Sequence, residues 1–149
     1  MKRTLLAGVL LCLAACRAPS SVLDSAALQD RLAPVPTAIP KGQCAIVLMP
    51  RAEKADPIFF QVLGRREAFI ALDKKQQRLT LKRANNKLEN GLWLKQELEG
   101  HRLSISLTLR PINAAQDTAP YRGVVSLTRP AGWSNAIAVK GRIECQSRN

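Results

Sequence analysis

Four cysteines offer the most reactive side chains in this chain of 149 residues. A thiol can join another thiol in a disulfide, or it can carry a covalently attached lipid. Cys12 and Cys16 fall within the first sixteen residues, which open with two basic residues and continue as an apolar run. This order is typical of a secretory signal, and the run is too short to span a membrane, which needs about 20 apolar residues. We therefore expect residues 1–15 to be a signal peptide that is removed.

The residues Leu13-Ala14-Ala15-Cys16 resemble the lipobox of bacterial lipoproteins. The resemblance implies that Cys16 is alkylated with diacylglycerol, that the chain is cut just before it, and that the new amino terminus is acylated, as with palmitate. Several acyl chains, at about 0.8 kcal/mol per buried methylene, give a stable anchor. Arg17 stands where an Asp would favour the inner membrane, so we expect an outer-membrane protein that faces the periplasm. The alternative is an ordinary secretory signal in which Cys16 has no role.

Two cysteines remain for a disulfide once Cys12 is removed and Cys16 carries lipid. Cys44 and Cys145 would lie in an oxidising compartment, and we expect them to pair there. The bond would close a loop of about one hundred residues, for which chain entropy contributes roughly 4 to 5 kcal/mol. Two free buried thiols are the alternative.

Few other residues suggest chemistry. His101 is the only histidine, and it falls in a predicted turn without the nucleophile and orienting acid of a catalytic triad. Glu97 and Glu99 share one face of a predicted strand, as paired acids of a hydrolase could, but we interpret them as solvated charges. No group of possible ligands has the spacing of a zinc or calcium site. We expect a protein that is not an enzyme and holds no metal or cofactor.

The elements that must position these residues fall into two parts. Residues 16–42 are rich in Ala, Pro and Ser, so we expect a lipidated flexible tether, with a short helix that could form within residues 21–32. Fully extended, residues 17–42 would reach at most about 90 Å. Residues 43–149 change to a period of two and are expected to form one antiparallel β domain.

Alternating apolar and polar residues predict the strands of this domain. The clearest alternation covers residues 102–110 and 135–145. Further strands are predicted at residues 43–49, 58–64, 67–73, 77–83, 92–98 and 121–129. The connections are too short for a crossover helix, so neighbouring strands should be antiparallel. The expected fold class is all-β, a single antiparallel β-barrel or β-sandwich of about eight strands behind the tether.

Both remaining cysteines share the apolar side of their strands. Cys44 alternates in step with Ile46 and Leu48, and Cys145 alternates in step with Ile143. One cysteine belongs to the first strand and the other to the last. A bond between them would fasten the two ends of the sheet where an open edge would otherwise remain.

The mature chain is strongly basic. Removing Lys2 and Arg3 takes the 23 basic residues to 21, against 11 acidic residues, which leaves a net charge of +10. This charge favours polyanionic partners, which in the envelope are anionic lipid, lipopolysaccharide or an acidic envelope protein; nucleic acid is not expected there. A solubilising face that protects an edge strand is the alternative reading of the local charge. The candidate anion-binding or partner-binding residues are Arg65, Arg66, Lys74, Lys75, Arg78, Lys82, Arg83 and Lys87.

These features predict a non-enzymatic lipoprotein that binds or scaffolds in the cell envelope and could serve a larger assembly. The alternative is an inhibitor of an acidic target enzyme, since small periplasmic barrels with a disulfide between near-terminal strands resemble the membrane-bound inhibitors of c-type lysozyme. That resemblance is one of architecture, without the family's motif residues. Because c-type lysozymes are basic, the target of this cationic chain would have to be acidic. Trp133 could fill a barrel end or stay exposed as a contact residue.

Overall fold

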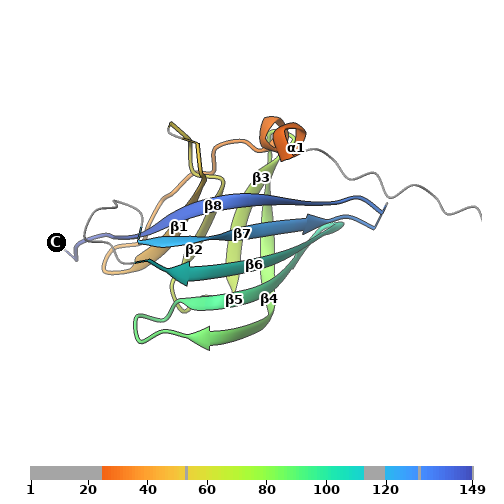
Figure 1. Ribbon diagram of the computed structural model, residues 1–149. Coiled ribbons are helices and arrows are strands. Elements are labelled where there is room, and N and C mark those ends of the chain that lie inside the picture. Colours follow the sequence, from red (N-terminus) through yellow and green to blue (C-terminus); the bar gives the residue numbers. More distant parts are fainter. Residues whose placement is uncertain (1–24, 53, 113–119, 131, 149) are drawn as a thin grey trace, which may run out of the picture.

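The computed structural model describes residues 25–52, 54–112, 120–130 and 132–148. The expected signal peptide and Cys16 lie outside these residues. Within them the chain forms one short helix and eight strands (Figure 1). The elements are α1 (Ser25–Arg31), β1 (Cys44–Pro50), β2 (Phe59–Val62), β3 (Glu67–Leu72), β4 (Lys75–Lys87), β5 (Trp93–Gly100), β6 (Leu103–Pro111), β7 (Tyr121–Thr128) and β8 (Ser134–Cys145).

The strands form a closed antiparallel barrel in sequential order. Each strand pairs with the next along the chain, and β8 pairs with β1 to complete the circle. The short connections explain this order, because two consecutive strands joined by a tight turn can only run antiparallel. The all-β prediction is confirmed. The sequence left a barrel and a sandwich open, and the structure shows the barrel.

Strand β4 departs most from the predicted boundaries. The sequence predicted that this strand ends at Arg83. In the structure Arg83, Ala84 and Asn85 all pair with β5, after an irregularity of register between Leu81 and Arg83. This irregularity leaves Lys82 and Arg83 both exposed and interrupts the alternation on which the prediction depended.

Apolar side chains fill the interior of the barrel. Strand β6 shows the pattern most clearly, since Leu103, Ile105, Leu107 and Leu109 are buried while the polar residues between them are exposed. These side chains belong to one core cluster with residues from all eight strands, and Phe59 is among its fully buried members. Burial of each large apolar side chain contributes about 1.5 to 3 kcal/mol, so this cluster is the main source of stability.

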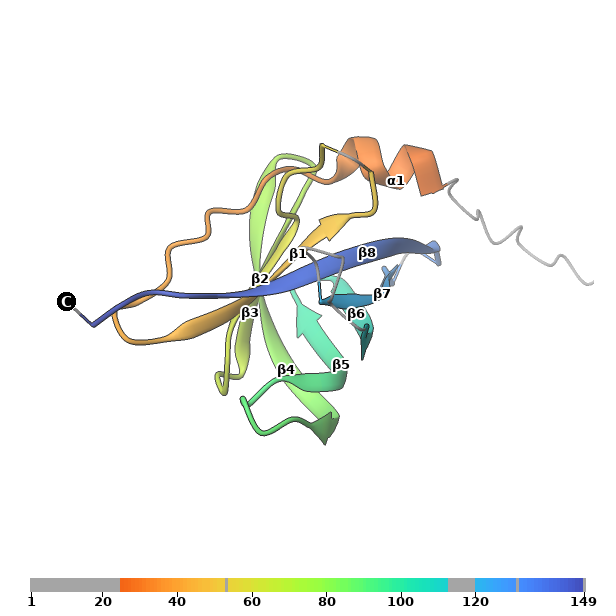
Figure 2. The same ribbon diagram turned by 60° about the vertical axis from the view of Figure 1, so that its left-hand side comes forward.

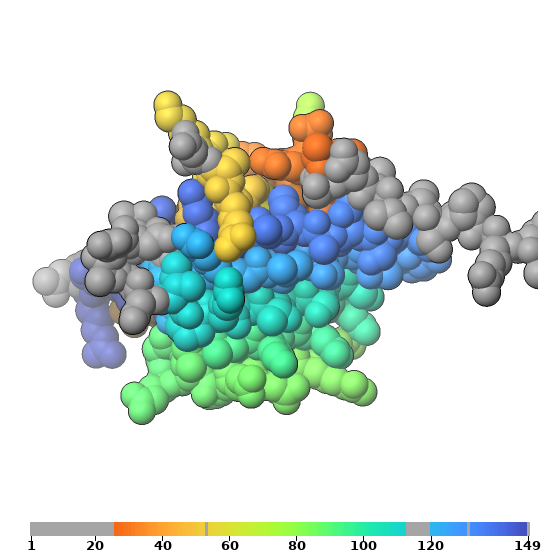
Figure 3. Space-filling view, in the orientation of Figure 1, coloured from red at the N-terminus to blue at the C-terminus, as the bar shows by residue number. Residues whose placement is uncertain are grey.

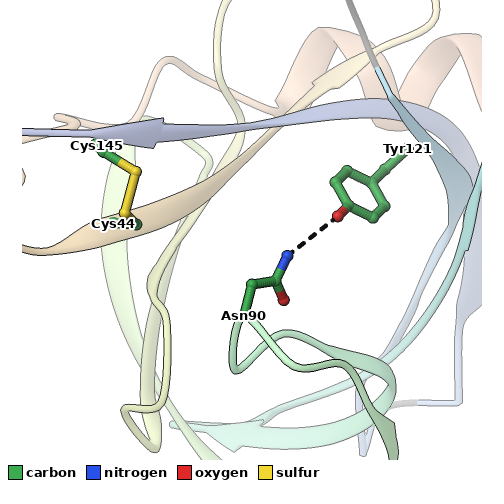
Figure 4. Close-up of a disulfide and its surroundings, with 4 residues drawn as sticks. All are labelled: Cys44, Asn90, Tyr121 and Cys145. Carbon is green, nitrogen blue, oxygen red and sulfur yellow. Dashed lines mark hydrogen bonds between the residues drawn. A yellow bond between two sulfur atoms is a disulfide. The ribbon is translucent and has the colours of Figure 1, made fainter. Parts of the chain in front are cut away.

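Both ends of the barrel are covered. At the helix end, Leu28 of α1 is fully buried in the barrel core, and the β7–β8 connection brings Trp133 against the same core. At the opposite, disulfide end, the β4–β5 connection buries Leu92, and Asn90 Nδ2 donates a 3.3 Å hydrogen bond to Tyr121 Oη (Figure 4). The sequence left open whether Trp133 fills a barrel end or stays exposed as a contact residue. In the structure it is half-buried at the helix end of the barrel.

The segment after α1 is packed on the barrel wall, unlike the flexible tether expected for residues 16–42. The backbone nitrogens of Ala33 and Val35 donate hydrogen bonds of 3.1 Å to the carbonyl of Ala71 and 2.8 Å to the carbonyl of Pro57. Val35 is buried against Phe60. Figure 2 shows the segment running along the outside of β1–β3 before it turns into β1.

The reason for this packing lies in the outer face of β1–β3. Most of the outward residues of these strands are apolar, so this face needs a cover. The sequence does indicate that this strand is buried on both faces. Residues 45–49 form an unbroken apolar run, whereas a half-buried strand would alternate apolar and polar residues. The outward residues of these strands that are buried in one cluster are Ala45, Val47, Phe60, Val62 and Ala71.

Candidate binding surfaces

The disulfide joins the first strand of the barrel to the last. Cys44 and Cys145 are direct partners in the β1–β8 ladder, and their sulfurs are bonded (Figure 4). Cys44 lies in step with the buried Ile46, as predicted, although Cys145 is exposed because the pair sits at the mouth of the barrel. The predicted pairing is confirmed, and it locks the ladder that closes the sheet.

An ion cluster at the helix end ties α1 to the barrel. Arg31 donates hydrogen bonds of 2.7 Å to both carboxylate oxygens of Asp73, in the β3–β4 turn. Arg129, from the β7–β8 connection, reaches the same carboxylate at 3.2 Å. Both guanidinium groups lie over the ring of Trp133, at 5.2 Å and 5.4 Å from its centroid. The pKa of Asp73 is held below its usual value, chiefly by the hydrogen bonds from Arg31 and also by the charges of both arginines.

The eight basic residues predicted as a binding cluster are spread along the barrel. Arg65 and Arg66 lie beside the β2–β3 turn at the disulfide end, whereas Lys74 and Lys75 lie at the helix end. Lys87 is at the disulfide end, with its ammonium 5.4 Å from the ring centroid of Trp93. The structure therefore does not gather them into one compact site.

The remaining members of this predicted cluster face acids on neighbouring strands. Exposed pairs of this kind contribute little to stability, but they offset the positive charge of the wall. The glutamates that we interpreted as solvated charges are two of these partners. The pairs are Arg78 with Glu67 at 3.6 Å, Lys82 with Glu99 at 3.2 Å, and Arg83 with Glu97 at 3.9 Å.

A second cationic surface, which no local sequence pattern indicated, crosses β6, β7 and β8. Arg110 is the cross-strand partner of Arg122, which is the partner of Lys140. Arg51 is held near them because its backbone nitrogen donates a 3.2 Å hydrogen bond to the carbonyl of Ala138. These residues come from four distant parts of the chain, so only the strand register brings them together.

A groove of about 250 Å³ lies beside these cations on the outer wall. Val124, in its centre, is 42% exposed and is the one large apolar side chain exposed among the residues that the structure describes. In Figure 3 the yellow connection after β1 comes down onto the blue and cyan surface of β6–β8. We call this site the arginine groove; its lining includes Arg51, Thr108, Arg110, Arg122, Val124 and Ala138.

Other candidate residues have ordinary surroundings. His101 is exposed in the β5–β6 turn, where it was expected. Within the described ranges, no three His, Cys, Asp or Glu side chains are grouped so that they could hold a metal ion. In the same part of the chain, no helix has the length and apolar character needed to cross a membrane.

No protein-family model, curated protein or solved structure matches this chain. Its function is therefore inferred from the geometry and the charge of the barrel itself.

Proposed function

We propose that this chain is a lipid-anchored protein of the outer membrane, facing the periplasm, that binds or scaffolds a partner in the cell envelope without catalysing a reaction. The observation that carries the proposal is the disulfide between Cys44 and Cys145. Structural disulfides persist in oxidising compartments such as the periplasm. The lipobox-like residues that end at Cys16 support the anchor. The apolar filling of the barrel supports a binding role for its outer surface.

The docked helix limits the distance between barrel and anchor. The sequence allowed about 90 Å for a fully extended tether, but the chain is packed against the barrel from α1 onward. Only residues 17–24 separate Cys16 from Ser25. At 3.3 to 3.6 Å per residue, this stretch reaches at most about 30 Å. An anchored barrel would therefore stay close to the membrane surface.

Metabolic labelling with an alkyne analogue of palmitate, followed by membrane fractionation, tests the anchor. We expect the wild-type chain to be labelled and to sediment with the outer membrane, and Cys16→Ala to lose both properties. Cys12→Ala is the matched control, since this residue lies in the segment expected to be removed, and it should keep the label. Labelled Cys16→Ala protein would contradict the proposal.

Affinity capture after crosslinking of intact envelopes tests the binding role. We expect the wild-type protein to recover a component of an envelope assembly, and Cys16→Ala to lose it. The row of Arg110, Arg122 and Lys140 also suits an acidic protein surface, which favours the inhibitor as the second candidate. Recovery of a soluble acidic enzyme whose activity falls when the purified barrel is added would favour the inhibitor instead.

A further inference from the structure

We infer that the helix end of the barrel faces the membrane and rests on the headgroups of a bilayer that contains anionic phospholipid. The inference rests on the proposed anchor at Cys16 and deepens it by naming the part of the barrel that meets the lipid. We call this part the helix-end surface. It consists of α1 and of the β3–β4, β5–β6 and β7–β8 connections, and its exposed cations include Lys74, Lys75 and Arg102.

The first reason is the place where the anchored segment joins the barrel. Helix α1 begins at Ser25 and buries Leu28 in the helix end. The residues between Cys16 and Ser25 reach at most about 30 Å. Strand β6, with 9 residues, is itself about 30 Å long, so the disulfide end lies roughly one barrel length farther away. The tether therefore brings the helix end to the bilayer first.

The second reason is the positive charge that several elements bring to this end. In a barrel of consecutive antiparallel strands, alternate connections lie at the same end, so these three connections share the helix end. A flat lipid surface needs the charges on one end of the barrel and does not need them in one pocket. Five basic against two acidic residues leave +3 among the described residues of this surface. They are Arg31, Lys74, Lys75, Arg102 and Arg129 against Asp30 and Asp73.

The acid that is nearest to the cationic turn is already paired. Asp73 accepts hydrogen bonds from both Arg31 and Arg129, so two cations surround one carboxylate. An unpaired carboxylate would repel anionic headgroups, whereas this cluster keeps a net positive charge.

The third reason is that this surface carries cations where the backbone favours glycine. Asp73 and Lys74 form the two-residue loop between β3 and β4, with φ values of 55° and 61°. A type I′ turn requires positive φ at both residues and prefers Asp-Gly. Arg102, in the β5–β6 turn, has a φ of 54°, whereas the β2–β3 and β4–β5 turns at the disulfide end use Gly64 and Gly91. Charges that contact a partner outside the chain explain why Lys74 and Arg102 stand against the local preference of the backbone.

Chemical coupling of Cys16 to a maleimide lipid in vesicles tests the inference without depending on lipidation in cells. In the mature chain from residue 16, Cys44 and Cys145 are bonded to each other, which leaves the Cys16 thiol for coupling. The vesicles contain neutral phosphatidylcholine, alone or mixed with phosphatidylglycerol, and a few dansyl-labelled headgroups. Energy transfer from tryptophan to dansyl then reports how close each end lies to the lipid. Trp93→Phe keeps the tryptophan at the helix end, and Trp133→Phe keeps the one at the disulfide end.

On vesicles with phosphatidylglycerol, we expect energy transfer from Trp133 to exceed that from Trp93 at least twofold. High salt or neutral vesicles should reduce this ratio, because both weaken the attraction between exposed charges. Lys74→Gly with Arg102→Gly should also reduce the ratio. Because glycine suits a left-handed backbone, the same double change should raise the midpoint of thermal unfolding by a few degrees. A change that stabilises the fold and weakens the lipid contact separates a binding role of these cations from a structural one.

A matched control removes the same charge at the disulfide end. Lys41→Gln with Arg65→Gln changes two exposed residues there and should leave the ratio unchanged. Higher transfer from Trp93 than from Trp133 would overturn the orientation. Equal ratios on neutral and anionic vesicles, or an equal loss in both double variants, would overturn the contact made by Lys74 and Arg102. Because the anchor is supplied chemically, these outcomes would leave the palmitate labelling of Cys16 as a separate test.

Discussion

Arg31, the last residue of α1, and Asp73, in the β3–β4 turn, are joined by two hydrogen bonds of 2.7 Å across 42 positions of the chain. Arg129 binds the same carboxylate from a third element. A helix of seven residues is too short to be stable alone in water, so these contacts and the burial of Leu28 are what keep α1 folded. The helix is therefore a part of the barrel rather than of a tether.

Replacing Asp73 by Asn should lower the free energy of unfolding by about 1 kcal/mol at pH 7, a modest loss because the carboxylate is 41% exposed and partly screened. Asn is chosen because it tolerates the positive φ of 55° at this position. The pKa of Asp73 is lowered in the folded state, so its contribution is present above the unfolded pKa of about 3.9 and is lost as the pH falls through the folded value. Urea unfolding measured at several pH values should therefore show the two proteins converging below about pH 4. A difference that persists at the lowest pH would contradict this explanation.

Truncation of Leu28 tests whether the helix is docked. Leu28→Ala removes a fully buried side chain and should cost about 2 to 4 kcal/mol in urea unfolding. Gln29→Ala changes an exposed residue of the same helix and should cost less than about 0.5 kcal/mol. If both variants unfolded with the wild-type midpoint, residues 25–31 would be a free tether after all.

Loss of the disulfide should be the most damaging change to the closed barrel. The bond spans 101 positions, for which chain entropy gives roughly 4 to 5 kcal/mol, so Cys44→Ala with Cys145→Ala should lower the unfolding free energy by about this amount. Thiol titration of the denatured, unreduced mature protein should find no free sulfhydryl. Two reactive thiols in that measurement would show that the bond is absent in cells.

Alanine substitutions at Gly123 and Gly64 should distinguish a steric clash between strands from strain of the backbone. A Cβ at position 123 would overlap the carbonyl oxygen of Thr108, so Gly123→Ala should force β6 and β7 apart and cost about 2 kcal/mol or more. Gly64 has open space around it and a φ of +77°, so Gly64→Ala should cost only about 1 kcal/mol, from backbone strain. Thermal unfolding followed by circular dichroism compares the two variants. A larger loss for Gly64→Ala would contradict the close approach of the strands.

The parts of the structure that could be predicted depend on local signals. Alternation with a period of two marks a strand wherever one face is buried, and the parity of Cys44 and Cys145 followed from the same pattern. The packing of residues 33–42 was missed because it depends on the outer face of three other strands, even though the apolar run at residues 45–49 hinted at it.

The arginine groove could not be predicted from the sequence. Arg51, Arg110 and Arg122 lie apart in the chain, and no local pattern connects them. Their proximity depends on which residue of one strand faces which residue of the next, and a shift of register by one position would turn alternate side chains to the other face. The basic residues at positions 65–87 were conspicuous because they are close in sequence, but the barrel distributes them over both ends.

The circular pairing of the eight strands also limits how any partner could be recognised. Each strand has a neighbour on both sides, so the barrel has no edge strand whose whole length is open to an added peptide strand. Recognition must then depend mainly on side chains. Substitutions on the outer wall should therefore be able to abolish binding of a partner while leaving the barrel intact.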